Sequence, residues 1–284
     1  MVRILTDSAA DFTPAEAEKL GITVIPLNVT FEDGSVIRDS IDMTPDEYYQ
    51  ALSRCKKLPT TSQPSPALFE HAFAQAAAEG DQVVAILISE KLSGTCQSAR
   101  LGAEMAGCDN VFVIDSTTAT LAQALLVRLA VRLRDEGKPA AQIVAAIEQA
   151  KKHVHLAAVI DDLNYLRKGG RLPAGVAFAG GMLGVKPLIA VAEGRVKLIG
   201  SARGLPGAYV ALFKKVEGMG GVNPRFETAA FYTENPREVE PIQTYLTHNL
   251  HLPQPHLGQI GCVIGTHAGP GAFAVSFFDP DLTL

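Results

Sequence analysis

The run Val83-Val84-Ala85-Ile86-Leu87-Ile88 decides the fold class, because six apolar residues follow one another without a break. Runs of this kind are typical of a parallel strand that is buried on both faces. A polar segment at residues 89–95 follows, and a helix is predicted from about Thr95 to Ala106. A strand, a polar turn and a helix in this order predict one unit of a parallel sheet with helices packed on it.

The same alternation extends to both sides of this run. Residues 2–5 and 22–29 have the apolar character of strands, and Glu32-Asp33-Gly34 predicts a hairpin turn between strands. Capping boxes, each with a proline at the first helical position, predict helices that begin after Thr13 and Thr44. Further predictions in this half are helices at 65–80, 119–136 and 140–153, and a strand at 111–114.

The chain has 284 residues, which suggests two domains at about 100–200 residues each. We expect an α/β fold with a parallel-sheet N-terminal domain over residues 1–153. The second half begins with a predicted strand at 156–160 and contains a predicted hairpin around Glu193-Gly194. Its elements suggest a mixed-sheet α+β C-terminal domain over residues 154–284.

Composition argues against several classes of protein. The formal net charge is -5 and the sequence has no long basic run, so we expect no nucleic-acid partner. The four cysteines form no C-x-x-C pair, which argues against a zinc site and a thioredoxin-type centre. Four cysteines in a chain of this length also do not resemble a disulfide framework. The uncharged stretch 172–185 is shorter than the roughly 20 apolar residues of a membrane span. We therefore expect a cytoplasmic protein with no stable membrane insertion, no cofactor and no metal.

Three segments rich in small polar residues are candidates for a binding site. They are residues 60–65, just before a predicted helix, residues 89–95, between a predicted strand and a helix, and residues 265–271, after a predicted strand that ends at Ile264. Ligands of open α/β sheets bind outside the carboxyl ends of the strands, and hydroxyls with free N–H groups suit an anion. The alternative is that these serines and threonines only cap helices.

Single residues in these segments allow more than one interpretation. His267, predicted to lie in a loop, is either a general base or ligand-contacting donor, or a histidine that is structural or merely exposed. Asp7 most simply closes an Asx turn, although it could orient a partner or a metal. Ser93 is not part of a G-x-S-x-G motif, and Cys96 is expected to be a buried, inert thiol. The glycine- and alanine-rich stretch 172–185 could let an extended apolar chain approach the backbone, or could be a packed core helix.

Five motifs, in order along the chain, resemble the DegV family over nearly the whole sequence. They are Thr6-Asp7-Ser8, Thr61-Ser62-Gln63-Pro64-Ser65, Leu92-Ser93-Gly94-Thr95, Leu166-Arg167-Lys168-Gly169-Gly170-Arg171 and the 265–271 segment. The resemblance implies two α/β domains with a long-chain fatty acid in a tunnel between them. It also implies a role like that of the binding subunit of a bacterial fatty acid kinase. Such a subunit presents the carboxylate to a separate ATP-dependent kinase that makes acyl phosphate for phospholipid synthesis.

The resemblance also implies roles for individual residues. Thr61 and Ser93 would hydrogen-bond the carboxylate. Contacts at the carboxylate end or with the partner are implied for Ser62, Gly94, Thr95, Arg171, Arg203 and His267. The chain departs from the family after Arg203, where Gly204-Leu205-Pro206-Gly207 replaces a lysine-bearing stretch.

Two other hypotheses compete with fatty-acid binding. One is an acyl hydrolase or transferase that uses Ser93 as nucleophile and His267 as base. The other is a structural or regulatory protein whose loops bind nothing. We expect no catalysis by the chain alone, because no catalytic motif is present.

Overall fold

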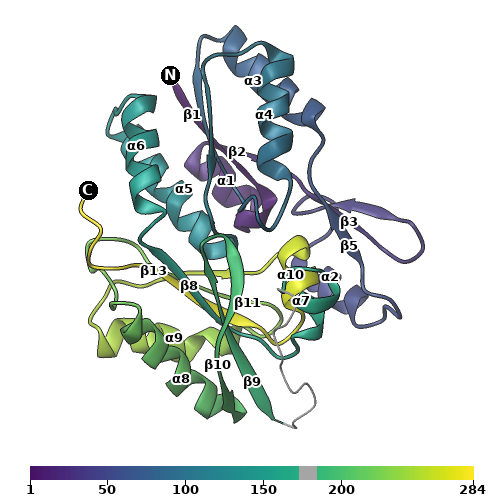
Figure 1. The fold of residues 1–284 in the computed structure, drawn as a ribbon, viewed down its shortest axis with the longest axis vertical. Helices are drawn as coiled ribbons and strands as arrows, with labels where there is room; N and C mark the ends of the chain where they lie inside the picture. The colour runs from purple at the N-terminus through teal and green to yellow at the C-terminus, as the bar shows by residue number, and fades with distance from the viewer. Residues whose placement is uncertain (173–183) are drawn as a thin grey trace.

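The computed structural model describes residues 1–172 and 184–284, and within them the strands form three sheets. The prediction that an extended apolar chain approaches the backbone at 172–185 therefore lies mostly outside the described residues. Figure 1 shows the two larger sheets one above the other along the long axis of the molecule. None of the described helices is long and apolar enough to cross a lipid bilayer.

The first sheet is parallel, as the sequence predicts. Its strand order is β2-β1-β6-β7, formed by Ile22–Ile25, Val2–Asp7, Gln82–Leu87 and Val111–Asp115. Helices α3 (Pro66–Ala78) and α4 (Thr95–Ala106) cover one face, and α5 (Thr120–Asp135) and α6 (Ala140–Ala150) cover the other. The central strand β6 is therefore buried on both faces, which explains its unbroken apolar run.

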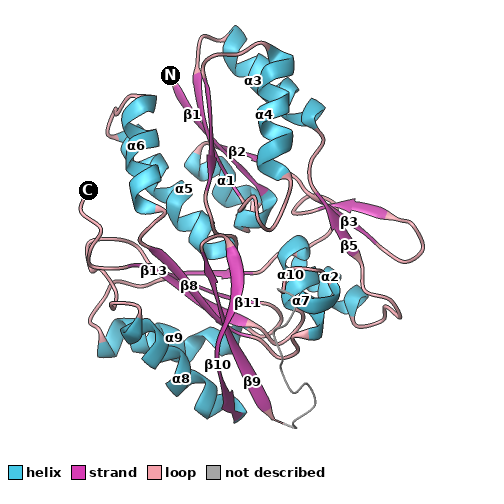
Figure 2. Cartoon of the chain, viewed as in Figure 1, coloured by secondary structure: helices cyan, strands magenta, loops and turns pink. Residues whose placement is uncertain are grey.

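The second sheet is mixed, as expected for the second half of the chain. Its order is β10-β9-β8-β13-β11-β12, and only the β11–β12 pair is parallel. The strands are Arg195–Arg203, Val185–Ala192, Val154–Val159, Phe273–Phe278, Ala229–Tyr232 and His256–Gln259. Figure 2 shows α8 (Gly204–Gly218) and α9 (Glu240–Thr244) together on one side of this sheet. A 3-10 turn (Pro236–Val239) precedes α9 and a π-helical turn (Tyr245–Asn249) follows it.

Helix α5 joins the two larger sheets. It packs on β1 and β6 of the first sheet and on β8, β11 and β13 of the second. A helix that is apolar around most of its circumference is typical of a buried position. Eleven of the sixteen residues of α5 are buried, in agreement with this position between two sheets. The proposed division between residues 153 and 154 places α5 in the N-terminal domain, and that boundary stays a prediction.

The third sheet corrects one prediction. Residues 22–29 do not form one strand, because β2 ends at Ile25 and β3 (Asn28–Thr30) belongs to a different sheet. Pro26 lies between the two strands and has no N–H to donate to a continuing ladder. The predicted hairpin at Glu32-Asp33-Gly34 is confirmed, since β3 pairs antiparallel with β4 (Val36–Arg38). Strand β5 (Thr60–Ser62) completes this small sheet.

A second correction concerns the segment at 265–271. The residues before it do not form a strand; Cys262–Ala268 form the helix α10, which packs against α2 (Pro45–Leu52). Gly265 is not a loop glycine there. A Cβ on Gly265 would overlap the Tyr49 ring, so the missing side chain allows α2 and α10 to approach closely. A close packing contact of this kind leaves no local sign in the sequence.

Local helix signals, in contrast, are confirmed. Both capping boxes are present, at Thr13 before α1 (Pro14–Leu20) and at Thr44 before α2. In each box the threonine hydroxyl accepts from the backbone N–H three residues later, and the glutamate accepts from the threonine N–H. These bonds involve only neighbours in the chain, so the sequence alone shows them.

Candidate functional site

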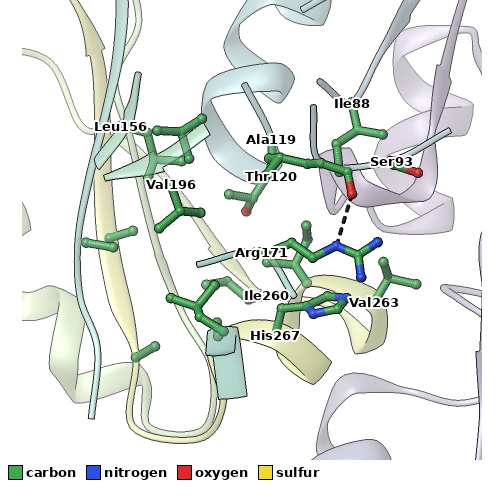
Figure 3. Close-up of a pocket in the computed structure, with 18 of the residues that line it drawn as sticks. Ile88, Ser93, Ala119, Thr120, Leu156, Arg171, Val196, Ile260, Val263 and His267 are labelled. Atoms are coloured by element: carbon green, nitrogen blue, oxygen red, sulfur yellow. Dashed lines mark hydrogen bonds between the residues drawn. The ribbon is translucent and has the colours of Figure 1, made fainter. Parts of the chain in front are cut away.

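A cavity lies between the mixed sheet and the loops that follow strands β6 and β7 of the first sheet (Figure 3). Strands β8, β9, β10 and β13 of the mixed sheet, with the residues next to them, supply an apolar wall. This wall consists of Leu156, Ala158, Ile160, Ile189, Val191, Val196, Ala272, Phe273 and Ala274. An apolar cavity with a few convergent polar groups is the usual form of a small-molecule site.

The polar groups gather at one end of the cavity. In Figure 3, Arg171 and His267 lie together with Ser93 nearby, away from Leu156 and Val196. Thr61, Ser62 and Gln63 line the same cavity from β5 and the following loop. The structure therefore brings together five of the residues singled out in the sequence: Thr61, Ser62, Ser93, Arg171 and His267.

Thr61 reaches this end because side chains alternate along a strand. In β5, Thr60 and Ser62 are exposed and Thr61 is half-buried. Its hydroxyl lies 2.9 Å from Nε2 of His267. His267 lies in the last turn of α10 and not in a loop, which corrects its predicted position.

The environment of His267 holds it neutral. Burial, reinforced by the positive charge of Arg171, lowers the pKa of His267 to about 4. At neutral pH the ring therefore has one N–H and one acceptor nitrogen. Within the described residues, Nδ1 is buried without a hydrogen-bond partner.

Arg171 brings a cation to the same end of the cavity. Gly170 ends α7 (Asn164–Lys168) in the left-handed conformation, with φ 72°, and the Arg171 N–H bonds to the carbonyl of Leu166. The guanidinium donates to the carbonyls of Leu92 at 3.0 Å and Gly169 at 2.6 Å. Burial lowers the pKa of Arg171, and no carboxylate among the described residues counteracts this effect. A partly buried cation without a counter-ion favours an anionic ligand.

Ser93 lies in the loop between β6 and α4. Its hydroxyl is 2.8 Å from that of Thr95, which is buried in the first turn of α4. Gly94 is the residue before α4, and the Gln63 side chain lies where a Cβ of Gly94 would be. Gly94 and Thr95 thus support the loop and are not part of the cavity lining.

The residues proposed for acyl hydrolysis are not paired. His267 contacts Thr61 and Ser93 contacts Thr95, and no hydrogen bond joins Ser93 to His267 in the described structure. A serine nucleophile is normally activated by a base within hydrogen-bond distance. The arrangement offers hydroxyl donors to an anion instead.

Arg203 lies elsewhere. It is the exposed last residue of β10, immediately before α8, and it does not line the cavity. Gly204, the first residue of the segment that departs from the family, begins α8 with φ 68°. The structure therefore separates Arg203 from the group around Thr61.

Two other sequence interpretations are confirmed. Asp7 forms the expected Asx turn, accepting from the N–H of Ala9 at 3.0 Å, and its second oxygen accepts from the N–H of Ile88 at 2.7 Å. Burial raises the pKa of Asp7 to about 7. Cys96 is buried, and burial raises the pKa of its thiol, so it is not an activated nucleophile. The described residues contain no cluster of metal-binding side chains.

Sequence reasoning missed several parts of the site. Thr120, the first residue of α5, lines the cavity, and no local signal marks it. Gln63 belongs to a motif that indicates the family, but its residue type and position do not reveal that its side chain lies against Gly94, in the loop before α4. The apolar wall was missed as a set because its members come from strands far apart in the sequence.

Comparisons with known proteins agree with this architecture. A family model described as an uncharacterised protein of the DegV family matches residues 1–279. A DegV domain-containing protein of Deinococcus radiodurans is 36% identical over 275 residues, which cover 97% of each chain.

Solved structures are similar over the whole chain. A fatty-acid-binding DegV family protein from Thermus thermophilus has a TM-score of 0.89 and 31% identity, over 98% of this chain and 99% of that one. A stearic-acid-binding protein from Eubacterium ventriosum has a TM-score of 0.86 and 27% identity, over 99% of both chains. The family model, the relative and both structures extend over nearly the full length of the sequence, and the chain therefore belongs to the DegV family.

Proposed function

We propose that this protein binds a long-chain fatty acid, with the carboxylate at the polar end of the cavity and the hydrocarbon along the apolar wall. One observation carries the proposal: Arg171, a cation without a counter-ion in the described residues, lies at the polar end of an otherwise apolar cavity. The fatty-acid-binding and stearic-acid-binding proteins named above, which share this fold, support the same ligand class.

The polar groups can act as donors in a consistent arrangement. With its proton on Nε2, His267 donates to the Thr61 hydroxyl, whose own hydrogen is then free for a carboxylate oxygen. In the same way, Thr95 can donate to Ser93, which leaves the Ser93 hydrogen for the ligand. Arg171 would supply the balancing charge. Each donor is supported by a group behind it, which fixes its direction.

The hydrocarbon tail and the carboxylate of a fatty acid would contribute differently to the free energy of binding. Burying one CH₂ group is worth about 0.8 kcal/mol, so about fifteen contribute on the order of 12 kcal/mol before the costs of association. Two hydroxyl hydrogen bonds contribute roughly 0.5–1.5 kcal/mol each. The tail therefore supplies most of the affinity, and the hydroxyls fix the position of the carboxylate.

The ligand class is tested by analysis of the purified protein. Protein isolated from a bacterial host is expected to contain a long-chain fatty acid, detected by mass spectrometry of a solvent extract. Delipidated protein should then bind an added fluorescent fatty acid. An extract without lipid, together with no binding of added fatty acid, would contradict the proposal.

The two hydroxyls are tested by Thr61→Ala and Ser93→Ala. Each change removes one donor from a buried carboxylate, so each is expected to weaken binding by about 1–3 kcal/mol. Fluorescent fatty-acid titration measures the affinity, and thermal melting verifies the fold. Ser65→Ala is the matched control, because Ser65 is exposed in the loop after β5 and caps no helix N–H. Wild-type affinity in both Thr61→Ala and Ser93→Ala would remove the carboxylate assignment.

We further propose that the bound acid is presented to a separate fatty acid kinase and that the chain has no catalytic activity of its own. The absence of a Ser93–His267 pair in the described residues supports the second part. The exposed position of Arg203 outside the cavity suits a partner contact.

The partner role is tested with a cognate kinase and ATP. Bound fatty acid should be phosphorylated, and Arg203→Ala should reduce that phosphorylation while lipid affinity stays the same. Loss of lipid affinity in Arg203→Ala would place Arg203 in the ligand site. Ester hydrolysis by the chain alone that disappears in Ser93→Ala would favour the hydrolase instead.

A further inference from the structure

The start of α10 is bound by two carboxylates from the distant N-terminal part of the chain. An oxygen of Asp11 accepts from the N–H of Gly261, and an oxygen of Asp39 accepts from the N–H of Cys262, both at 3.0 Å. Gly261 is the residue before the helix and has no side chain that could cap it. Asp11 and Asp39 therefore cap the N-terminus of α10, a role that a serine or threonine adjacent to the helix usually has.

This arrangement is energetically expensive. Asp11 is 7% exposed and Asp39 is 1% exposed, and burial raises the pKa of both carboxyl groups. Within the described residues, one oxygen of Asp39 has no hydrogen-bond partner. The second oxygen of Asp11 accepts from the Thr120 hydroxyl at 2.5 Å. A buried carboxylate costs several kcal/mol unless its bonds compensate for lost hydration, so a simple cap does not explain two of them.

Backbone geometry is also unusual at this point. Asp11 and Thr120 both adopt positive φ, at 56° and 48°, in the region that favours glycine. Positive φ is especially unfavourable for a β-branched residue such as threonine. Thr120 also lines the cavity. Strained residues of this kind are concentrated at functional sites, where the surrounding structure holds them in place.

The two carboxylates leave α10 little freedom. A Cβ built on Gly261 would lie 2.9 Å from an oxygen of Asp11 and 3.3 Å from an oxygen of Asp39. At the other end of this seven-residue helix, His267 meets Thr61. A shift or tilt at the start of so short a helix is transmitted to its last turn.

We propose that Asp11 and Asp39 are positioning residues for the polar end of the cavity. By fixing the start of α10, they place His267 within hydrogen-bond distance of Thr61. The consequence for lipid affinity rests on the proposed function. The consequence for His267 does not, because it concerns the lipid-free protein.

The test uses the ring ¹⁵N resonances of His267 in lipid-free protein, assigned with His267→Gln among the seven histidines. Asp11→Ala and Asp39→Ala are expected to move these resonances toward their positions in Thr61→Ala. They should also weaken fatty-acid binding about tenfold, the effect of losing one well-placed hydrogen bond. Asp11→Asn and Asp39→Asn keep an acceptor oxygen for α10 and should restore both properties.

Asp81→Ala is the matched control. Asp81 is 2% exposed and binds Arg3 and the N-terminal amine, with no contact to α10. Its loss should lower the melting temperature without changing the His267 resonances. A purely structural role for Asp11 and Asp39 would give the same result in their alanine variants.

Gly261→Ala decides the question if the aspartate variants do not fold. It keeps both carboxylates, and Gly261 has φ −72°, which alanine readily adopts. The added Cβ would force the carboxylates and the start of α10 apart, so the His267 resonances should again move. Unchanged resonances in folded Gly261→Ala, or in folded Asp11→Ala and Asp39→Ala, would overturn the proposal. If the wild-type protein binds no fatty acid, the proposed function fails while the His267 measurement still decides the positioning role.

Discussion

Replacing Arg171 with methionine is expected to weaken fatty-acid binding by about 2–4 kcal/mol, or about 30- to 1000-fold in Kd. The guanidinium is partly buried at the polar end of the cavity, and no described carboxylate balances its charge. Under the proposed function, the carboxylate of the fatty acid would supply that balance. Without Arg171 the carboxylate would be buried with hydroxyl donors alone, and a buried charge that loses its partner is strongly destabilised.

The lipid-free protein should respond differently. Methionine keeps an unbranched, flexible stem of similar length, so packing is largely retained. The change also removes a cation that is costly to bury, although it gives up the bonds to the carbonyls of Leu92 and Gly169. We therefore expect little change in melting temperature without lipid and a large loss of the stabilisation that added fatty acid produces.

Arg203→Met is the matched control for Arg171→Met. It removes the same chemical group from an exposed position outside the cavity, so lipid affinity should not change. Titration of delipidated proteins with a fluorescent fatty acid compares the three proteins directly. Equal affinities for wild type and Arg171→Met would show that Arg171 is not the counter-ion of the ligand.

The second large effect is expected from replacing Gly169, the residue that follows the last residue of α7. In Gly169→Ala the new Cβ would overlap Nδ1 of His267 and lie 2.8 Å from its Cε1. The ring must move away from Thr61, so we expect binding to weaken about 10- to 100-fold and the fold to lose about 1–3 kcal/mol. Gly169 has φ −72°, so the alanine backbone itself is not strained.

Gly170→Ala is the matched control, one residue away. No described atom lies within 4 Å of a Cβ on Gly170, but its φ of 72° is unfavourable for alanine. The control should therefore cost about 1–2 kcal/mol of stability and leave lipid affinity unchanged. Urea unfolding together with fatty-acid titration separates the two effects. The interpretation fails if both glycine variants bind lipid like the wild type, or if both lose affinity equally.

The sequence by itself determined the elements whose stabilising contacts are local or repetitive. The unbroken run in β6 indicated a parallel strand between two helical layers, and the structure confirms it. The capping boxes at Thr13 and Thr44 marked where α1 and α2 begin, because their hydrogen bonds join residues three positions apart. The helix at Thr95–Ala106 was also predicted with the observed bounds. The ordered motifs were sufficient to indicate the DegV family.

Tertiary structure alone decided the elements whose partners are distant. The segment before Gly269 looked like a strand and a glycine-rich loop, yet it forms α10, because Asp11 and Asp39 cap its start and Tyr49 packs against Gly265. Contacts that join positions more than 200 residues apart leave no periodic sign in the sequence.

The candidate site depends on the same kind of distant contact. Sequence patterns named Thr61, Ser93, Arg171 and His267 from separate motifs, and the fold places them around one cavity. The neutral state of His267 and the uncompensated charge of Arg171 arise from burial, which depends on how the two sheets and α10 close around these side chains. The sequence therefore indicated that these residues belong to the candidate site. It did not indicate their charge states or their neighbours across the cavity, because these depend on desolvation and packing between segments far apart in the sequence.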